Sequence, residues 1–354
     1  MKRLIILTDE DSEFLVSKAD LINFTSMDVE RIKKIFASMD FNVSVFKFSE
    51  LDLNEDYRGV YILYQTSEAR GSFYKRYIED LIYFLEKQGA FVLPKHELLK
   101  AHHDKVFMEL LRFKFSDNSL KTIKSWCYGS WRDARNYNNN FPVVIKRIST
   151  TSGEGVFLAK NRDEYLRKIR KAGRVILALD FADLCVLRLK NSLKKILKRI
   201  FPVRSKYVKY NTTPLSYPIV VQNFIENLSG DYKVLIFGRK YYSMYRKNRK
   251  NDFRASGSGK FYEVPDQEQI GLLTFARKIK DEIDFPIFGI DIAFDGKEYH
   301  LLEFQMIQIG TSALQRSKFW YEFNDGKWNR HEGHSNLEDE FARAIDEHIA
   351  LRYD

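Results

Sequence analysis

Hydrophobic and polar positions in the first part of the chain follow strand and helix periodicities in turn. Two stretches, 28–39 and 74–88, place apolar residues at helical spacing and predict amphipathic helices. Short apolar or alternating runs around them predict strands, at Leu4–Leu7, Asn42–Phe48, Val60–Tyr64 and Ala90–Leu93. Strands that alternate with helices are typical of a parallel sheet. We therefore expect an N-terminal α/β domain in residues 1–98.

The remaining sequence changes from this alternation to hairpins. Apolar runs flank Gly238-Arg239 and, further on, Asp295-Gly296-Lys297, so two β-hairpins are expected over 232–245 and 288–303. The other predicted helices and strands are Lys105–Phe113, Asp163–Ala172, Val175–Leu179, Val220–Phe224, Gln267–Ile283 and Leu337–Arg352. These elements predict two α+β lobes, a small central one in residues 99–178 and a larger one in 179–354.

The net charge of +10 is concentrated in one segment of the larger lobe. Between Leu184 and Ile225 there is no Asp or Glu, but nine Lys and Arg residues. The segment contains a predicted amphipathic helix, 189–201, within an insertion at about 186–212. It can be a solvated helix docked by its leucines, a collar for an anionic substrate, or a contact with a membrane surface. The rest of the chain is close to neutral, so nucleic acid is not an expected partner.

The cysteine content indicates the cellular setting. The chain has two cysteines, Cys127 and Cys185, too few for a disulfide framework and without metal-ligand spacing. We expect a reduced, cytoplasmic environment. The N-terminal apolar run Leu4–Leu7 is too short for a signal sequence, and acidic residues follow it at once.

A strand that ends in a lysine and a small polar loop is the first candidate for chemistry. The apolar run Val143–Ile145 ends at Lys146, and the Gly/Ser/Thr loop Ser149–Gly155 follows. A lysine charge and closely approachable backbone N–H groups suit the phosphates of a nucleotide. A hairpin with a solvated lysine fits this window equally well.

A second candidate is a pair of carboxylates on the last predicted hairpin. Asp291 and Glu303 lie inside apolar strands, and Gln305 points to the same side as Glu303 because alternate strand residues share a face. Oxygen-only ligands suit Mg²⁺ carried by nucleotide phosphates. Two rim carboxylates paired with lysines are the alternative, but an unpaired charge in an apolar strand is costly.

With these motifs in order, the chain resembles the ATP-grasp superfamily, and within it carboxylate–amine ligases such as the ribosomal-protein glutamate ligases and glutathione synthetase-like enzymes. The resemblance extends from about Lys105 to about Gln305. It implies a parallel α/β pre-domain, a small central lid subdomain and a C-terminal antiparallel-sheet subdomain. It also implies ATP and two Mg²⁺ ions as cofactors.

The resemblance also implies roles for individual residues. The nucleotide contacts are two lysines, the polar loop, the hinge strand and a later acid: Lys105, Lys146, Ser149, Ser152, Gly153, Glu154, Gly155, Gln222, Asn223, Phe224, Ile225, Glu226 and Asp231. The implied metal ligands are Asp291, Glu303 and Gln305, although Gln305 replaces the usual Asn. The implied catalytic residues are Arg254, Arg246 and Lys233, although Lys233 replaces the usual Arg and cannot grip an anion in a bidentate way.

The family's chemistry implies a ligase that activates a carboxylate as an acyl phosphate and transfers it to an amine or related nucleophile. The expected partners are a carboxylate and an amine acceptor, as an amino acid, a peptide or a sugar-linked acid. Two alternatives stay open, an ATP-grasp kinase and a non-catalytic ATP-binding regulator. For Arg254, an ion pair with Asp252 is the alternative to a catalytic role.

Overall fold

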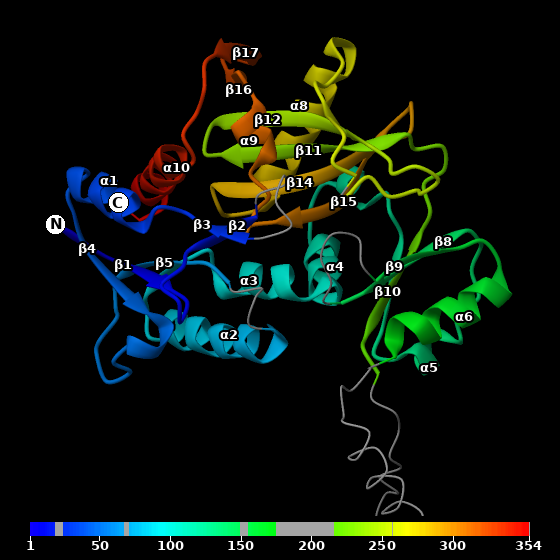
Figure 1. The fold of residues 1–354 in the computed structure, drawn as a ribbon, viewed down its shortest axis with the longest axis horizontal. Helices are drawn as coiled ribbons and strands as arrows, with labels where there is room; N and C mark the ends of the chain where they lie inside the picture. The colour runs from blue at the N-terminus through cyan, green and yellow to red at the C-terminus, as the bar shows by residue number, and fades with distance from the viewer. Residues whose placement is uncertain (18–23, 67–70, 149–154, 175–215, 257, 354) are drawn as a thin grey trace, which may run out of the picture.

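The computed structural model describes residues 1–17, 24–66, 71–148, 155–174, 216–256 and 258–353. Its secondary structure falls into a parallel sheet near the N-terminus, a small antiparallel sheet in the middle and a large antiparallel sheet in the C-terminal half (Figure 1). This mixed α/β arrangement confirms the fold class expected from the sequence. Two calls, the strand at 175–179 and the basic insertion at 186–212, lie outside the described residues.

The N-terminal sheet is parallel, with strand order β4-β1-β5-β6. Its strands are β1 (Lys2–Thr8), β4 (Phe41–Lys47), β5 (Tyr61–Tyr64) and β6 (Phe91–Leu93). The surrounding elements are β2 (Leu15–Ser17), β3 (Phe24–Ser26), α1 (Val29–Ser38), the 3₁₀ turn Phe48–Glu50, α2 (Gly71–Lys87) and α3 (His96–His103).

Alternation along β1 explains why helices cover both faces of this sheet. Leu4 and Ile6 are packed in one apolar cluster with Phe36 of α1, whereas Ile5 and Leu7 belong to a second cluster with side chains of α2. Successive strand residues point to opposite faces, so a strand that is apolar at every position must be buried on both sides. The alternation of strands and helices in the sequence therefore predicted this parallel sheet correctly.

The central subdomain is a four-stranded antiparallel sheet of order β7-β10-β8-β9. Its elements are α4 (Lys105–Phe113), the 3₁₀ turn Asn118–Lys121, β7 (Ser125–Tyr128), α5 (Trp131–Ala134), β8 (Val143–Arg147), β9 (Val156–Ala159), α6 (Arg162–Gly173) and β10 (Ile219–Asn223). One face of β8, with Val143 and Ile145, packs on Tyr165 and Ile169 of α6. The other face, with Val144 and Lys146, is only partly buried.

The C-terminal sheet has the order β15-β14-β11-β12-β16-β17, and β13 pairs with β12. Its strands are β11 (Gly230–Phe237), β12 (Lys240–Lys247), β13 (Phe261–Tyr262), β14 (Ile287–Phe294), β15 (Tyr299–Gln305), β16 (Phe319–Asn324) and β17 (Lys327–Glu332). Its helices are α8 (Asp266–Glu282), α9 (Ser312–Arg316) and α10 (Leu337–Arg352). Both predicted hairpins are present, as β11–β12 and β14–β15.

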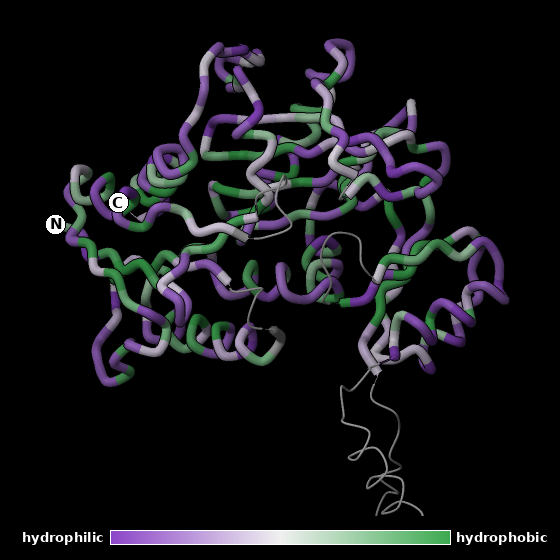
Figure 2. The backbone as a smooth tube through the Cα atoms, in the orientation of Figure 1, coloured by the Kyte–Doolittle hydropathy of each residue, from purple (hydrophilic) through white to green (hydrophobic). Residues whose placement is uncertain are grey.

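Helix α8 covers one face of this sheet. Tyr232 of β11 hydrogen-bonds Glu268 of α8, and Ser243 of β12 donates to Gln269 at 3.1 Å. Hydrophobic segments follow the strands in the interior, and the outer helices alternate between hydrophobic and hydrophilic positions (Figure 2). None of the helices in the described ranges is long and apolar enough to cross a bilayer.

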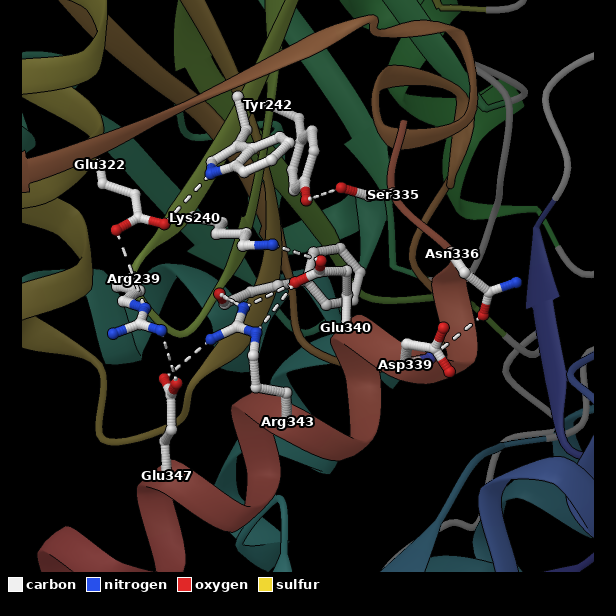
Figure 3. A network of polar contacts seen from close by, with 12 residues as sticks. Arg239, Lys240, Tyr242, Glu322, Ser335, Asn336, Asp339, Glu340, Arg343 and Glu347 are labelled. Atoms are coloured by element: carbon white, nitrogen blue, oxygen red, sulfur yellow. Dashed lines mark hydrogen bonds and ion pairs between the residues drawn. The ribbon is translucent and has the colours of Figure 1, made fainter. Parts of the chain in front are cut away.

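Helix α10 contacts both the large sheet and the N-terminal domain. Glu340 pairs with Lys240 at 2.6 Å and with Arg343 at 2.7 Å, and Arg343 also donates to the Phe237 carbonyl at 2.9 Å (Figure 3). On its other side, α10 lies against α1, where Asp339 pairs with Arg31 at 2.8 Å. The first and last parts of the chain therefore share one packed interface.

Candidate active site

The predicted carboxylates lie side by side in the large sheet. Asp291 of β14 is in register with Glu303 of β15 on one side and with Lys233 of β11 on the other. Paired residues on neighbouring strands project to the same face. This is the face opposite α8, because Tyr232 and its in-register neighbours point the other way. A cation, an anion and a second anion therefore lie in a row across three strands.

Asp291 is held by two cations. Lys233 Nζ lies 2.9 Å from one carboxylate oxygen of Asp291, and Arg246 Nη2 lies 2.8 Å from the other. Burial acts to raise the pKa of Asp291, but Arg246 and Lys233 outweigh it and hold the pKa well below the usual range. Asp291 is therefore a carboxylate that stays ionised and keeps a fixed orientation.

Arg246 is itself oriented by a second acid. Asp231 accepts from Arg246 through both oxygens, at 2.7 Å from Nε and 2.8 Å from Nη2, in a bidentate pair. Burial raises the pKa of Asp231, against the effect of Arg246. Asp231 was predicted as a nucleotide contact. In the structure it binds the guanidinium of Arg246, which therefore lies between the carboxylates of Asp231 and Asp291.

Both predicted phosphate lysines contact β15 at or next to Glu303. Lys105 Nζ lies 3.7 Å from Glu303 Oε1, and Lys146 Nζ donates to the carbonyl of Leu302, the residue before it, at 3.3 Å. Burial lowers the pKa of Lys146, and Glu303 and Glu109 partly oppose that shift. Two lysines from different segments therefore contact neighbouring residues of β15, Lys105 at the Glu303 carboxylate and Lys146 at the Leu302 carbonyl.

The local sequence fixes where Lys105 stands. Asp104 caps helix α4 and accepts from the N–H groups of Val106 and Phe107, at 2.7 and 3.3 Å. The backbone N–H of Lys105 donates to the carbonyl of Ile148 at 3.3 Å. Lys105 thus joins the helix start to the end of β8, directly before the predicted phosphate loop. Of that loop, Ser149, Ser152, Gly153 and Glu154 lie outside the described residues, and Gly155 has a positive φ of 71°.

Some of the predicted hinge residues are held by hydrogen bonds, and others are more exposed. Gln222 donates to Glu109 and Ser125, both at 3.0 Å, so its side chain belongs to a buried network. Asn223 accepts from the Lys124 N–H at 2.6 Å, and the Phe224 N–H donates to the Pro142 carbonyl at 3.3 Å.

The end of the hinge is more accessible. Ile225 is half-buried and Glu226 is exposed. The ring of Phe224 stacks edge-on with Phe253, with centroids 5.9 Å apart. The end of the hinge strand therefore packs against the segment that carries Arg254.

Arg254 pairs with a local acid. Its guanidinium lies 2.6 Å from Asp252, and the side chains of both residues are about a quarter exposed or less, at 28% and 19%. This is the contact that was weighed against a catalytic role in the sequence. Asp252 therefore holds the Arg254 guanidinium in a fixed orientation.

The donor chemistry of the predicted metal site fits Mg²⁺. Asp291 and Glu303 are in register on one face, and Gln305 follows on the same face, where it is half-buried. All three offer hard oxygen ligands. Gly289, in register with Gln305, has no side chain, and a Cβ there would lie 3.2 Å from Lys233 Nζ. The missing side chain keeps this part of the face open.

Sequence reasoning missed a buried ionic pair behind the lysines. Glu109 and Arg112 on α4 form an i,i+3 ion pair, and Arg112 also donates to the Leu301 carbonyl at 2.9 Å. The pair joins α4 to β15, the strand that carries Glu303. In the sequence, Glu109 and Arg112 share the polar side of the helix with Lys105, which is the pattern of a solvated face, so no local signal reveals that the structure buries them and exposes Leu110 and Phe113.

A second missed network lies at the end of the parallel sheet. His103 Nδ1 lies 2.6 Å from Glu79, and Nε2 lies 2.6 Å from the Thr66 hydroxyl. Burial lowers the pKa of His103 to about 4, against the effect of Glu79. A neutral imidazole that donates to the carboxylate must then accept from Thr66. This chain of contacts ends two residues before Lys105.

Comparison with known proteins identifies the fold. The RiPP-associated ATP-grasp ligase of Chryseobacterium gregarium, solved with ADP and a leader and core peptide, has a TM-score of 0.51 at 13% identity, over 100% of this chain and 98% of that one. D-alanyl-alanine synthetase A of Vibrio cholerae O1 biovar eltor has a TM-score of 0.52 at 10% identity, over 99% of each chain. No protein-family model matches the sequence, and no curated protein is significantly similar to it in sequence. The chain therefore has the ATP-grasp fold.

Proposed function

We propose that this chain is an ATP-dependent ligase that activates a carboxylate as an acyl phosphate and transfers the acyl group to an amine. The observation that carries the proposal is that Lys105 and Lys146 contact β15 at Glu303 and at the preceding residue, Leu302, with Asp291 in register beside Glu303. Cations and acids in this arrangement suit a metal-bound triphosphate. Similarity of fold to ligases that join amino acids or peptides supports the same reaction class.

In the proposed reaction, the lysines and arginines act by position and charge. Lys105 and Lys146 bind phosphate oxygens of ATP, and Asp291, Glu303 and Gln305 would hold Mg²⁺. When bound, Mg²⁺ neutralises charge on the phosphate oxygens. A substrate carboxylate oxygen then attacks the γ-phosphorus, and ADP leaves.

The second step forms the amide. The amine attacks the carbonyl carbon of the acyl phosphate, phosphate leaves with the shared electron pair, and the amine proton passes to solvent. Charge on the tetrahedral oxygen needs fixed donors. Arg246 is oriented by two acids, and we assign this stabilisation to Arg246 and Lys233. We assign the entering carboxylate to Arg254, which exchanges Asp252 for the substrate anion.

An isotope experiment tests the reaction class. The chain is incubated with ATP, Mg²⁺ and a panel of amino acids, acidic peptides and sugar-linked acids whose carboxylates carry ¹⁸O. A ligase transfers one ¹⁸O from the carboxylate to the released phosphate, because the acyl phosphate breaks at its carbonyl carbon. Hydroxylamine in place of the amine should yield a hydroxamate.

Matched variants separate the site from general damage. Asp291→Asn and Glu303→Gln should abolish phosphate release, whereas Asp339→Asn, which removes a surface carboxylate paired with Arg31, should leave it unchanged. A phosphorylated alcohol without free phosphate would indicate the kinase instead. ATP binding without ADP formation across the panel would indicate the regulator.

A further inference from the structure

A cluster of potential metal ligands lies at the tip of the β14–β15 hairpin, away from the proposed nucleotide site. Asp295, Glu298 and His300 each place a ligand atom within 4.8 Å of the other two. In the described ranges of the chain, this is the one group of three or more His, Cys, Asp or Glu side chains that meets that condition. The two acids are exposed, and His300 is 6% exposed.

The hairpin register explains why the three side chains meet. His300 is in register with Ala293 on β14, so Asp295, two residues beyond Ala293, lies on the same face. Glu298, two residues before His300, lies there as well. Gly296 takes a φ of +94° at the tip, which allows the tight turn between them. The turn therefore gathers one imidazole and two carboxylates on one side.

His300 is fixed by its second ring nitrogen. Nδ1 lies 2.8 Å from the hydroxyl of Thr122, in the segment between the 3₁₀ turn Asn118–Lys121 and β7. This contact turns Nε2 toward Asp295, whose Oδ2 is 3.3 Å away. Metal-bound histidines typically have their other ring nitrogen hydrogen-bonded in this way.

The Nε2 atom is buried but makes no hydrogen bond within the described part of the chain. Asp295 uses Oδ1 to accept the N–H groups of Lys297 and Glu298, at 2.8 and 2.9 Å, which leaves Oδ2 facing the imidazole. When Nδ1 carries the proton and donates to the Thr122 hydroxyl, the Nε2 lone pair faces Asp295 Oδ2, and a cation between the two atoms makes that contact favourable. When Nε2 carries the proton, it donates to Asp295 Oδ2 instead, and a metal ion has to replace that proton.

The spacing suits a tetrahedral ion. Two ligands bonded at about 2.0–2.1 Å to Zn²⁺ in tetrahedral geometry are roughly 3.3–3.4 Å apart. The Nε2–Oδ2 distance of 3.3 Å matches that edge. An imidazole with two carboxylates favours a transition ion such as Zn²⁺ over Mg²⁺.

We propose that Asp295, Glu298 and His300 bind a divalent transition metal ion of the Zn²⁺ type, with water as the fourth ligand. The ion ties the tip of the β14–β15 hairpin, through His300 and Thr122, to the segment that leads into β7. It does not take part in the proposed ligase reaction. Its consequence is stabilisation of the hairpin that carries Asp291 and Glu303.

Metal titration tests the site without any ATP assay. The full chain is stripped of metal, placed in excess Mg²⁺ and titrated with Zn²⁺ by calorimetry and with Co²⁺ by visible absorption. We expect one tight site, an intense tetrahedral Co²⁺ band, and a rise in melting temperature with Zn²⁺. Glu298→Gln and Asp295→Asn change exposed residues, and Asp295→Asn keeps the Oδ1 acceptor of the turn.

Each of these variants should weaken Zn²⁺ binding at least tenfold, whereas Glu332→Gln, an exposed acid on the β16–β17 hairpin, should leave it unchanged. Thr122→Val tests the positioning contact and should weaken binding by roughly 10–100-fold, while the fold is retained. Equal Zn²⁺ affinity in wild type, Glu298→Gln and Asp295→Asn would overturn the proposal. Absence of the tetrahedral Co²⁺ band would overturn it too and leave only an imidazolium–carboxylate ion pair.

Discussion

At the scale of single residues, the proposed site depends on charges that compensate one another before any ligand arrives. Asp291 is held by Lys233 and Arg246, and Glu303 by Lys105. A buried charge is costly unless it is paired. The acids and basic side chains of the proposed site are therefore paired with each other, and a nucleotide and a metal ion that bind there would replace some of these contacts.

Removal of the Lys146 charge should mainly affect nucleotide binding. A hydrogen bond to a charged group contributes about 1.5–3 kcal/mol, so Lys146→Met should weaken ATP binding by roughly 10–100-fold. Isothermal titration with a non-hydrolysable ATP analogue and Mg²⁺ measures this. Lys278→Met, which removes an exposed lysine paired with Asp117, is the matched control and should bind as wild type. Equal affinity in the two variants would remove Lys146 from the site.

His103 should make stability depend on pH in a defined range. Its pKa is about 4 in the folded chain and about 6.5 when unfolded, so below pH 6.5 only the unfolded state takes up the proton. Stability should be unaffected by this group above that pH and fall by up to about 3 kcal/mol as the pH drops toward 4. Urea unfolding across this range, compared with His103→Gln, isolates the effect. A slope that persists in the variant would assign it to other groups.

At the scale of elements, hairpin registers decide which charges meet. Asp231 is in register with Arg246, and Lys233 with Asp291, because β11 pairs with β12 on one side and β14 on the other. A slip by one residue would turn these side chains to the face covered by α8. The hairpins position the site as much as its residues do.

Gly230, the first residue of β11, tests the start of this register. A Cβ at Gly230 would collide with the Arg246 carbonyl and the Tyr245 ring, so Gly230→Ala should destabilise the chain by about 1–3 kcal/mol. Thermal or urea unfolding measures the loss. Gly310→Ala is the matched control, because a Cβ there meets no atom within 4 Å and the φ of Gly310 is not positive. Similar losses in both variants would contradict the steric argument.

Sequence patterns predicted elements where periodicity was strong and failed where it was not. The β11–β12 and β14–β15 hairpins and helix α4 were predicted, because alternation or helical spacing marks them. Helix α3 was missed because it is short, lacks a side-chain cap at its start and is separated from α4 only by Asp104 in an extended conformation. The β16–β17 hairpin was missed because β17 is almost entirely polar and exposed.

For the candidate site too, the sequence indicated some residues and could not indicate others. Lys146, Asp291 and Glu303 could be singled out because each interrupts or ends an apolar run, whereas Lys105 was indicated only by the family resemblance. No local sequence pattern encodes the ion pair between Asp231 and Arg246 or the hydrogen bond from Gln222 to Glu109. Both depend on pairing between segments that are distant in the sequence. Spatial neighbours from distant segments are set by the register and packing of whole strands.

At the scale of the whole molecule, the residues that follow α10 pack against the N-terminal parallel sheet. Tyr353, after α10, packs its ring on Phe91 and Tyr61 of the N-terminal sheet, with centroids 4.4 and 5.9 Å apart. Lys95 pairs with Asp284 at 2.6 Å near the same place. These contacts hold the parallel sheet against the lobe that carries the metal-site acids.

Tyr353→Ala should weaken the packing between the C-terminal residues and the N-terminal sheet. Loss of a half-buried ring that contacts two aromatic residues should lower stability by about 1–3 kcal/mol, somewhat less than for a fully buried ring. Melting temperature and limited proteolysis measure the change. Leu351→Ala, at a position that is 83% exposed, is the control. Unchanged melting of Tyr353→Ala would show that α10 alone holds the two lobes together.

Lys105 contacts both the end of β8 and the large C-terminal sheet. Its amide bonds the Ile148 carbonyl of the central subdomain, and its side chain reaches Glu303 of the large sheet. Hydrogen exchange at that single amide therefore reports opening between α4 and β8. Slower exchange with ATP bound would measure, in free energy, how strongly nucleotide binding stabilises the contact between α4 and the end of β8.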